Sequence, residues 1–163
     1  MIWVVVLLVF GFTRLYNLDL IPIFADEAIY LRWAQLLAFD WRNLFVSLTD
    51  GKTPLFMWLL APWLRLGLDP LLTGRVLSAV SGLGTVVGVY FLAKKLFEEK
   101  TARLAAGLAL LQPFLLFYDR MSLTDSLLTA LIVWSVYFGT GVKLGVTAAL
   151  AMLVKPSALI YLL

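Results

Sequence analysis

Residues 71–97, LLTGRVLSAVSGLGTVVGVYFLAKKLF, form an apolar run broken only by one early arginine and two late lysines. A helix needs about 20 consecutive apolar residues to cross a bilayer, so this run predicts a transmembrane helix. The early arginine, Arg75, is expected to anchor that helix at the membrane surface. Small residues recur along the run and predict close packing against a neighbouring helix. They are Gly74, Ser78, Ser81, Gly82, Gly84 and Gly88.

The whole chain is unusually apolar. Hydrophobic residues make up 63% of it, against roughly 45–50% in soluble domains, and its mean hydropathy is +0.97. Backbone groups inside a bilayer must be hydrogen-bonded within the protein, which allows only helices or a closed barrel. The apolar runs lack the alternation of barrel strands. The net charge of +3 is spread over loops, so we expect no nucleic-acid interface.

We therefore predict an all-α, polytopic transmembrane helix bundle with about four to six membrane segments. Residues 1–17 lack a basic start and a cleavage motif, which favours a first span over a signal peptide. The last apolar run continues up to Leu163, the final residue, so we expect residues 1–163 to be the N-terminal part of a larger membrane domain. The expected segments are a first span over 1–17, an outer loop over 18–70, spans over 71–97, 101–118 and 126–138, and a further apolar segment over 144–163.

Two polar regions are predicted to share one side of the membrane. The loop 18–70 is expected to carry amphipathic helices over 26–39 and 55–66 that lie at the bilayer surface, where tryptophan and tyrosine are favoured. The basic loop 94–103 predicts a cytoplasmic side, which assigns 18–70 to the outer side. Two spans separate 18–70 from 119–125, so both face the same side in either orientation.

The residue types limit the chemistry that this chain can perform. It has no cysteine and no histidine, so acid–base steps fall on Asp, Glu, Lys or Tyr. Asp26 and Glu27 are either favourable helix-start residues or a general base beside the bilayer. Lys52 lies either in a solvated turn or at a helix start that binds an anion.

Two further cations and one further segment are candidates. Arg120 either extends to the membrane surface or binds phosphate, and the segment Ser122–Asp125 matches a helix capping box. Lys155 interrupts an apolar stretch, which marks either a helix end or a functional charge. Taken together, carboxylates Asp26, Glu27 and Asp125 and cations Lys52 and Arg120 suit a lipid-linked phosphate substrate and a hydroxyl acceptor.

The order of these segments resembles the N-terminal part of GT-C membrane glycosyltransferases. The nearest groups are the dolichyl-phosphate-mannose–protein mannosyltransferase-like and lipid A aminoarabinose transferase-like families. The resemblance rests on RLYNLD at 14–19, FADEAIY at 24–30, DGKTPL at 50–55, GRVLSAVSG at 74–82, the segment 120–125 with Leu128, and Lys155-Pro156. The sequence departs from the family pattern at Thr53-Pro54, where a second proline is usual, and at Asp119, where a small residue is usual.

This resemblance implies an enzyme that transfers a sugar from a polyprenyl-phosphate donor to a lipid, glycan or protein acceptor. The reaction would take place on the outer face of a bacterial or archaeal plasma membrane. The implied catalytic carboxylate is Asp26, with Glu27 beside it, and the implied donor-phosphate ligands are Lys52, Arg120 and Lys155. Asp26 and Asp125 together would be the ligands of a divalent metal, if one is required.

Two alternatives to an enzyme remain open at this point. One is a transporter or flippase-like bundle for lipid-linked sugars, which predicts charges within the spans and an internal repeat. The other is a non-catalytic membrane subunit, which explains the hydrophobicity but gives no reason for the set of Asp26, Lys52 and Arg120.

Overall fold

The computed structural model describes residues 2–162, and every regular element among them is helical. This confirms the predicted all-α membrane helix bundle. Two helical regions are long and apolar enough to cross a membrane, Trp3–Leu20 and Pro70–Leu96. The α-helices are α1 (Ile2–Leu15), α2 (Ala25–Phe39), α3 (Leu55–Arg65), α4 (Pro70–Leu96), α5 (Glu99–Leu111), α6 (Pro113–Tyr118), α7 (Thr124–Phe138), α8 (Gly141–Val154) and α9 (Ala158–Leu162). Short 3-10 turns occupy Leu18–Leu20, Trp41–Asn43 and Val46–Asp50.

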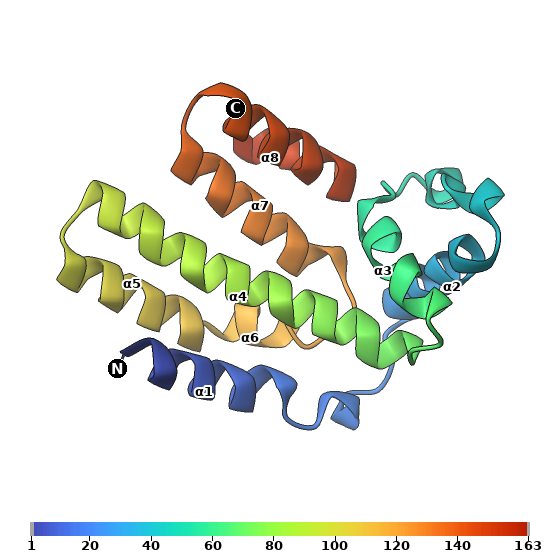
Figure 1. Ribbon diagram of the computed structural model, residues 1–163, viewed down its shortest axis with the longest axis horizontal. Helices are drawn as coiled ribbons and strands as arrows, with labels where there is room; N and C mark the ends of the chain where they lie inside the picture. Colours follow the sequence, from blue (N-terminus) through green and yellow to red (C-terminus); the bar gives the residue numbers. More distant parts are fainter. Residues whose placement is uncertain (1, 163) are drawn as a thin grey trace.

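The long helix α4 is the centre of the bundle. It packs against α7 on one side and α5 on the other, and α7 in turn packs against α8 (Figure 1). Its start is fixed by the Asp69 side chain, whose Oδ1 accepts a hydrogen bond of 2.8 Å from Leu72 N, and by Pro70 at the first helical position. The predicted small-residue face is buried at Gly74, Ser78, Ser81, Gly82 and Gly88.

Helices α2 and α3 form a separate pair at the N-terminal end of α4 (Figure 1). Their shared core contains Tyr30, Phe56 and Leu60 together with Met121 and Leu123 from the loop between α6 and α7. The segment 18–70 and the α6–α7 loop therefore contact each other directly.

The expected continuous helix over 101–118 is interrupted. Helix α5 ends at Leu111, Gln112 is extended, and Pro113 begins α6. A residue that precedes proline is biased away from helical conformation, and proline has no N–H to continue the ladder. The Gln112 side chain accepts a hydrogen bond of 2.7 Å from Leu115 N and caps α6. The residues that follow α6 contact α1 through Arg120 and α2 through Ser122.

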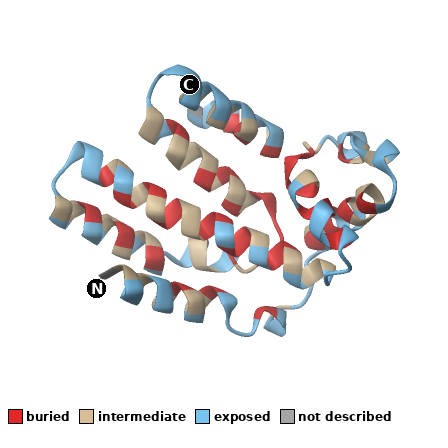
Figure 2. Cartoon of the chain, viewed as in Figure 1, coloured by how far each residue is buried: buried red, intermediate tan, exposed pale blue. Residues whose placement is uncertain are grey.

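Large apolar side chains remain exposed, including Val4, Leu8 and Phe12 on α1 and Val146 on α8. Buried residues concentrate where α4 meets α5 and α7 (Figure 2). An apolar exterior around a small-residue interior is the arrangement expected of helices surrounded by lipid.

Candidate functional site

Asp26 and Lys52 meet at the start of α2. Lys52 Nζ lies 3.0 Å from Asp26 Oδ1 and 3.6 Å from Asp50 Oδ2. The Asp26 side chain is 45% exposed and that of Lys52 is 28% exposed, so both remain accessible to a substrate. The turn that carries Lys52 is formed by the left-handed Gly51, whose φ of 69° favours glycine.

Aromatic rings surround the ammonium group of Lys52. It lies 4.9 Å from the ring centre of Tyr30 and 5.8 Å from that of Trp33, both on α2. Burial lowers the pKa of Lys52, but the hydrogen bond to Asp26 and the nearby charges outweigh it, so the pKa lies above its ordinary value. Lys52 is therefore a fixed cation, held in position by α2.

A second pair of the same kind lies nearby. Lys155 Nζ is 3.0 Å from Asp125 Oδ1, and both side chains are partly exposed. Lys155 follows the last residue of α8, Val154, which packs with Leu55 at the start of α3. Lys52 lies three residues before Leu55, so the two lysine–aspartate pairs lie near the same end of α3.

Glu27 is in a different environment from Asp26. Both its side chain and that of Arg75 are fully buried, and they form a salt bridge between α2 and α4. Glu27 Oε2 also accepts from Phe24 N at 3.0 Å and Oε1 from Ser122 N at 2.6 Å. Burial raises the pKa of Glu27, but these hydrogen bonds outweigh it, so the pKa lies below its ordinary value.

The Glu27–Arg75 pair revises two expectations. Arg75 is a buried structural residue and not a surface anchor: it also donates to the carbonyl oxygens of Leu18 and Ile21. Glu27 is enclosed by donors and cannot reach a substrate, so its accessible neighbour Asp26 is the better candidate for proton transfer. The two adjacent carboxylates point in different directions because successive residues of a helix lie on different faces.

The predicted capping box at 122–125 is wrong. Helix α7 is preceded by Leu123 and has no side-chain cap, and the buried Ser122 Oγ has no hydrogen-bond partner. The backbone N–H of Ser122 is instead used by Glu27. The residue acts through its main chain in holding the α6–α7 loop against α2.

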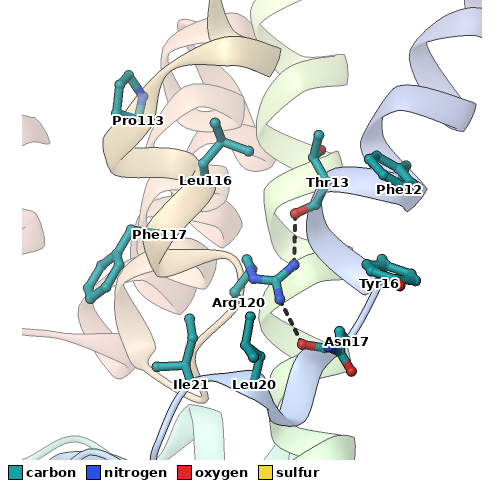
Figure 3. Close-up of a pocket in the computed structure, with 10 residues that line it drawn as sticks. All are labelled: Phe12, Thr13, Tyr16, Asn17, Leu20, Ile21, Pro113, Leu116, Phe117 and Arg120. Carbon is teal, nitrogen blue, oxygen red and sulfur yellow. Dashed lines mark hydrogen bonds between the residues drawn. The ribbon is translucent and has the colours of Figure 1, made fainter.

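Arg120 lies apart from the two lysine–aspartate pairs. Its guanidinium donates to the carbonyl oxygens of Thr13 at 2.9 Å and Asn17 at 2.8 Å, at the C-terminal end of α1 (Figure 3). It borders an apolar groove of about 600 Å³ between α1 and α6. A smaller cavity of about 290 Å³ lies on the other face of α6 and includes Tyr118 and Asp125.

A buried ion pair that the sequence reasoning did not single out joins α1 to the α6–α7 loop. Arg14 Nε lies 3.1 Å from Asp119 Oδ2, and neither side chain is appreciably exposed. Asp119 Oδ1 accepts a further hydrogen bond of 2.8 Å from Ser126 Oγ. The sequence does contain a signal for this pair: Arg14 and Asp119 each lie at the end of an apolar run. Charges at membrane depth are costly unless they are paired.

The carboxylates do not fit a divalent metal site. Asp26 and Asp125 are each paired with a lysine ammonium, which competes with a cation for the same oxygen atoms. Within residues 2–162, no group of three or more acidic side chains comes together. We therefore derive no step through a metal.

A family model for dolichyl-phosphate-mannose-protein mannosyltransferases matches residues 51–163. The chain belongs to this mannosyltransferase family. The matched range includes Lys52, Asp125 and Lys155, and Asp26 lies before it. Membership in the mannosyltransferase family indicates glycosyltransferase function at a membrane in general terms. No curated protein and no solved structure matches the chain.

Proposed function

We propose that this protein transfers a sugar from a polyprenyl-phosphate donor to a hydroxyl group of a lipid, glycan or protein acceptor. The reaction takes place at the outer membrane face. The observation that carries the proposal is the accessible Asp26–Lys52 pair, with the Asp125–Lys155 pair near the same end of α3. Two lysine ammonium groups suit the binding of one phosphate, and an exposed carboxylate suits the removal of the proton from the acceptor hydroxyl.

Lys52 and Lys155 hold the donor phosphate. Each ammonium has hydrogen-bond donors for phosphate oxygens and neutralises the charge that the phosphate gains as the sugar leaves. Without substrate, the aspartates occupy these donors. Asp125 keeps Lys155 in place, and the rings of Tyr30 and Trp33 keep Lys52 in place.

Asp26 is the general base. Its carboxylate accepts the proton of the acceptor hydroxyl while that oxygen forms a bond to the anomeric carbon of the sugar. The bond between the anomeric carbon and the phosphate oxygen breaks, and the phosphate keeps the electron pair. When the donor phosphate binds Lys52, it replaces Asp26 as the acceptor of the ammonium hydrogen bond and frees the carboxylate to take a proton.

Glu27 is a positioning residue in this proposal. Its salt bridge to Arg75 and its hydrogen bond from Phe24 N fix the first turn of α2, which carries Asp26. Arg120 is left out of the proposed donor site because its hydrogen bonds direct it to the α1–α6 groove.

The test is sugar transfer by the purified protein in lipid, with a panel of radiolabelled polyprenyl-phosphate hexoses and pentoses. We expect Asp26→Asn to lower the transfer rate by about 10²-fold or more while donor binding persists. Asp50→Asn is the matched control, since Asp50 also contacts Lys52 but is more exposed.

Equal transfer by the native protein and Asp26→Asn would remove Asp26 from the mechanism. No transfer by either protein over the whole donor panel would favour the transporter or the non-catalytic subunit.

A further inference from the structure

The groove between α1 and α6 combines an apolar wall with a single cation. Its lining includes the exposed side chains of Phe12, Tyr16 and Leu20 on one side and Phe117 on the other (Figure 3). Arg120 is the one charged residue of the lining. A volume of about 600 Å³ is within the usual range of roughly 300–1,000 Å³ for small-molecule sites.

The charge of Arg120 has no carboxylate to balance it within the described residues. Arg14 and Arg75 are each paired with an acidic side chain, whereas Arg120 donates only to the carbonyl oxygens of Thr13 and Asn17. These two bonds hold the guanidinium rigidly at the groove and leave its positive charge uncompensated. An arginine fixed in this way is suited to a phosphate oxygen.

The position of the groove separates it from the proposed transfer site. Residues Pro113, Leu116 and Phe117 of α6 line the groove, whereas Phe114 and Tyr118 line the cavity that contains Asp125. Helix α6 therefore lies between the two. The phosphate of a sugar donor must lie next to the base that activates the acceptor. That base, Asp26, does not line the groove that contains Arg120.

We propose that the α1–α6 groove binds an anionic phospholipid of the bilayer, with its phosphate on Arg120 and an acyl chain along the apolar wall. The site is independent of the sugar-transfer reaction. Such a lipid bridges α1 and α6 and adds to the backbone contacts that Arg120 makes with Thr13 and Asn17.

The test measures lipid retention on the protein by native mass spectrometry, with phosphatidylglycerol and phosphatidylcholine added as probes. We expect phosphatidylglycerol to be retained in preference to phosphatidylcholine. Arg120→Gln should lower retention by about tenfold, the effect of losing one charge-assisted hydrogen bond and its charge. Arg42→Gln, at an exposed arginine outside the groove, is the matched control and should retain the lipid.

A second variant keeps the arginine and its bonds to α1. Leu116→Trp fills the groove, and we expect it to lower retention of phosphatidylglycerol without changing the contacts of Arg120. Unchanged retention in both Arg120→Gln and Leu116→Trp would overturn the proposal, as would an equal loss in Arg42→Gln. If Arg120→Gln instead loses polyprenyl phosphate and keeps phosphatidylglycerol, the groove belongs to the donor and the proposal is wrong.

Discussion

The carboxylate of Glu27 and the guanidinium of Arg75 form a doubly hydrogen-bonded ion pair with both side chains fully buried. Arg75 Nε is 3.0 Å from Oε1, and Nη2 is 2.9 Å from Oε2. Glu27 takes two further hydrogen bonds from backbone N–H groups. The pair therefore connects α2, α4 and the α6–α7 loop at the residue that follows Asp26.

Removal of one member of this pair should destabilise the protein strongly. Arg75→Met leaves the Glu27 carboxylate buried without its cation, which costs about 3–5 kcal/mol. The double variant Glu27→Met with Arg75→Met should be less destabilised than Arg75→Met alone. The measurement is the free energy of unfolding in detergent. Arg42→Met, at an exposed site, should change it by less than about 0.5 kcal/mol; similar losses in the Arg42 and Arg75 variants would contradict the role of the pair.

Gly82 on α4 makes room for the buried Asp119. A Cβ atom at Gly82 would collide with the Asp119 carboxylate, which is held by Arg14 and Ser126. We expect Gly82→Ala to lower the free energy of unfolding by about 1–3 kcal/mol. Gly84→Ala is the control on the same helix, because its Cβ would lie 3.7 Å from that of Ala130, an ordinary contact. If both alanine variants were equally stable, the close approach at Gly82 would be unimportant.

Lys52 and Lys155 should contribute separately to donor binding. Lys52→Met and Lys155→Met are each expected to raise the KM for the polyprenyl-phosphate sugar about tenfold, since each loses a charged hydrogen-bond donor to phosphate. The exposed Lys143, at the start of α8, gives the control Lys143→Met with an unchanged KM. An unaltered donor KM in the Lys155 variant would restrict the phosphate site to Lys52.

Glu99, at the start of α5, provides a prediction about pH. Three hydrogen bonds lower the pKa of Glu99 from 4.5 to about 2. The bond from Lys94 has the largest effect, followed by those from Tyr90 and Arg103. Because the folded pKa is depressed, the stabilisation is complete above about pH 4.5 and is lost as the pH falls through about 2.

The measurement for Glu99 is Tm in detergent between pH 6 and pH 2. The Tm difference between the native protein and Glu99→Gln should narrow below pH 4.5. Glu98→Gln, at the exposed neighbour, should show no such narrowing. A difference that stays constant over the whole range would show that the ion pairs of Glu99 do not contribute to stability.

Local sequence signals predicted the positions of the site segments well. The turn or helix start expected at Lys52 matches the turn at Gly51 and the start of α3. Of the two interpretations of Lys155, the helix end matches the end of α8. Gln112-Pro113 interrupts a long apolar run in the same way, and there hydropathy alone does not reveal the break. The capping-box pattern at Ser122 failed because the Ser122 backbone N–H bonds to Glu27 and no side-chain oxygen caps α7.

The sequence by itself determined that this is a helical membrane bundle, because a long apolar chain in lipid must hydrogen-bond its backbone within each segment. It also determined where the charged residues interrupt the apolar runs. Only the tertiary structure decided which charges meet. Glu27 with Arg75 and Arg14 with Asp119 join residues far apart in the chain, and such pairs depend on how the helices pack. The same packing made Asp26 accessible, buried Glu27 next to it, and directed Arg120 to a different groove.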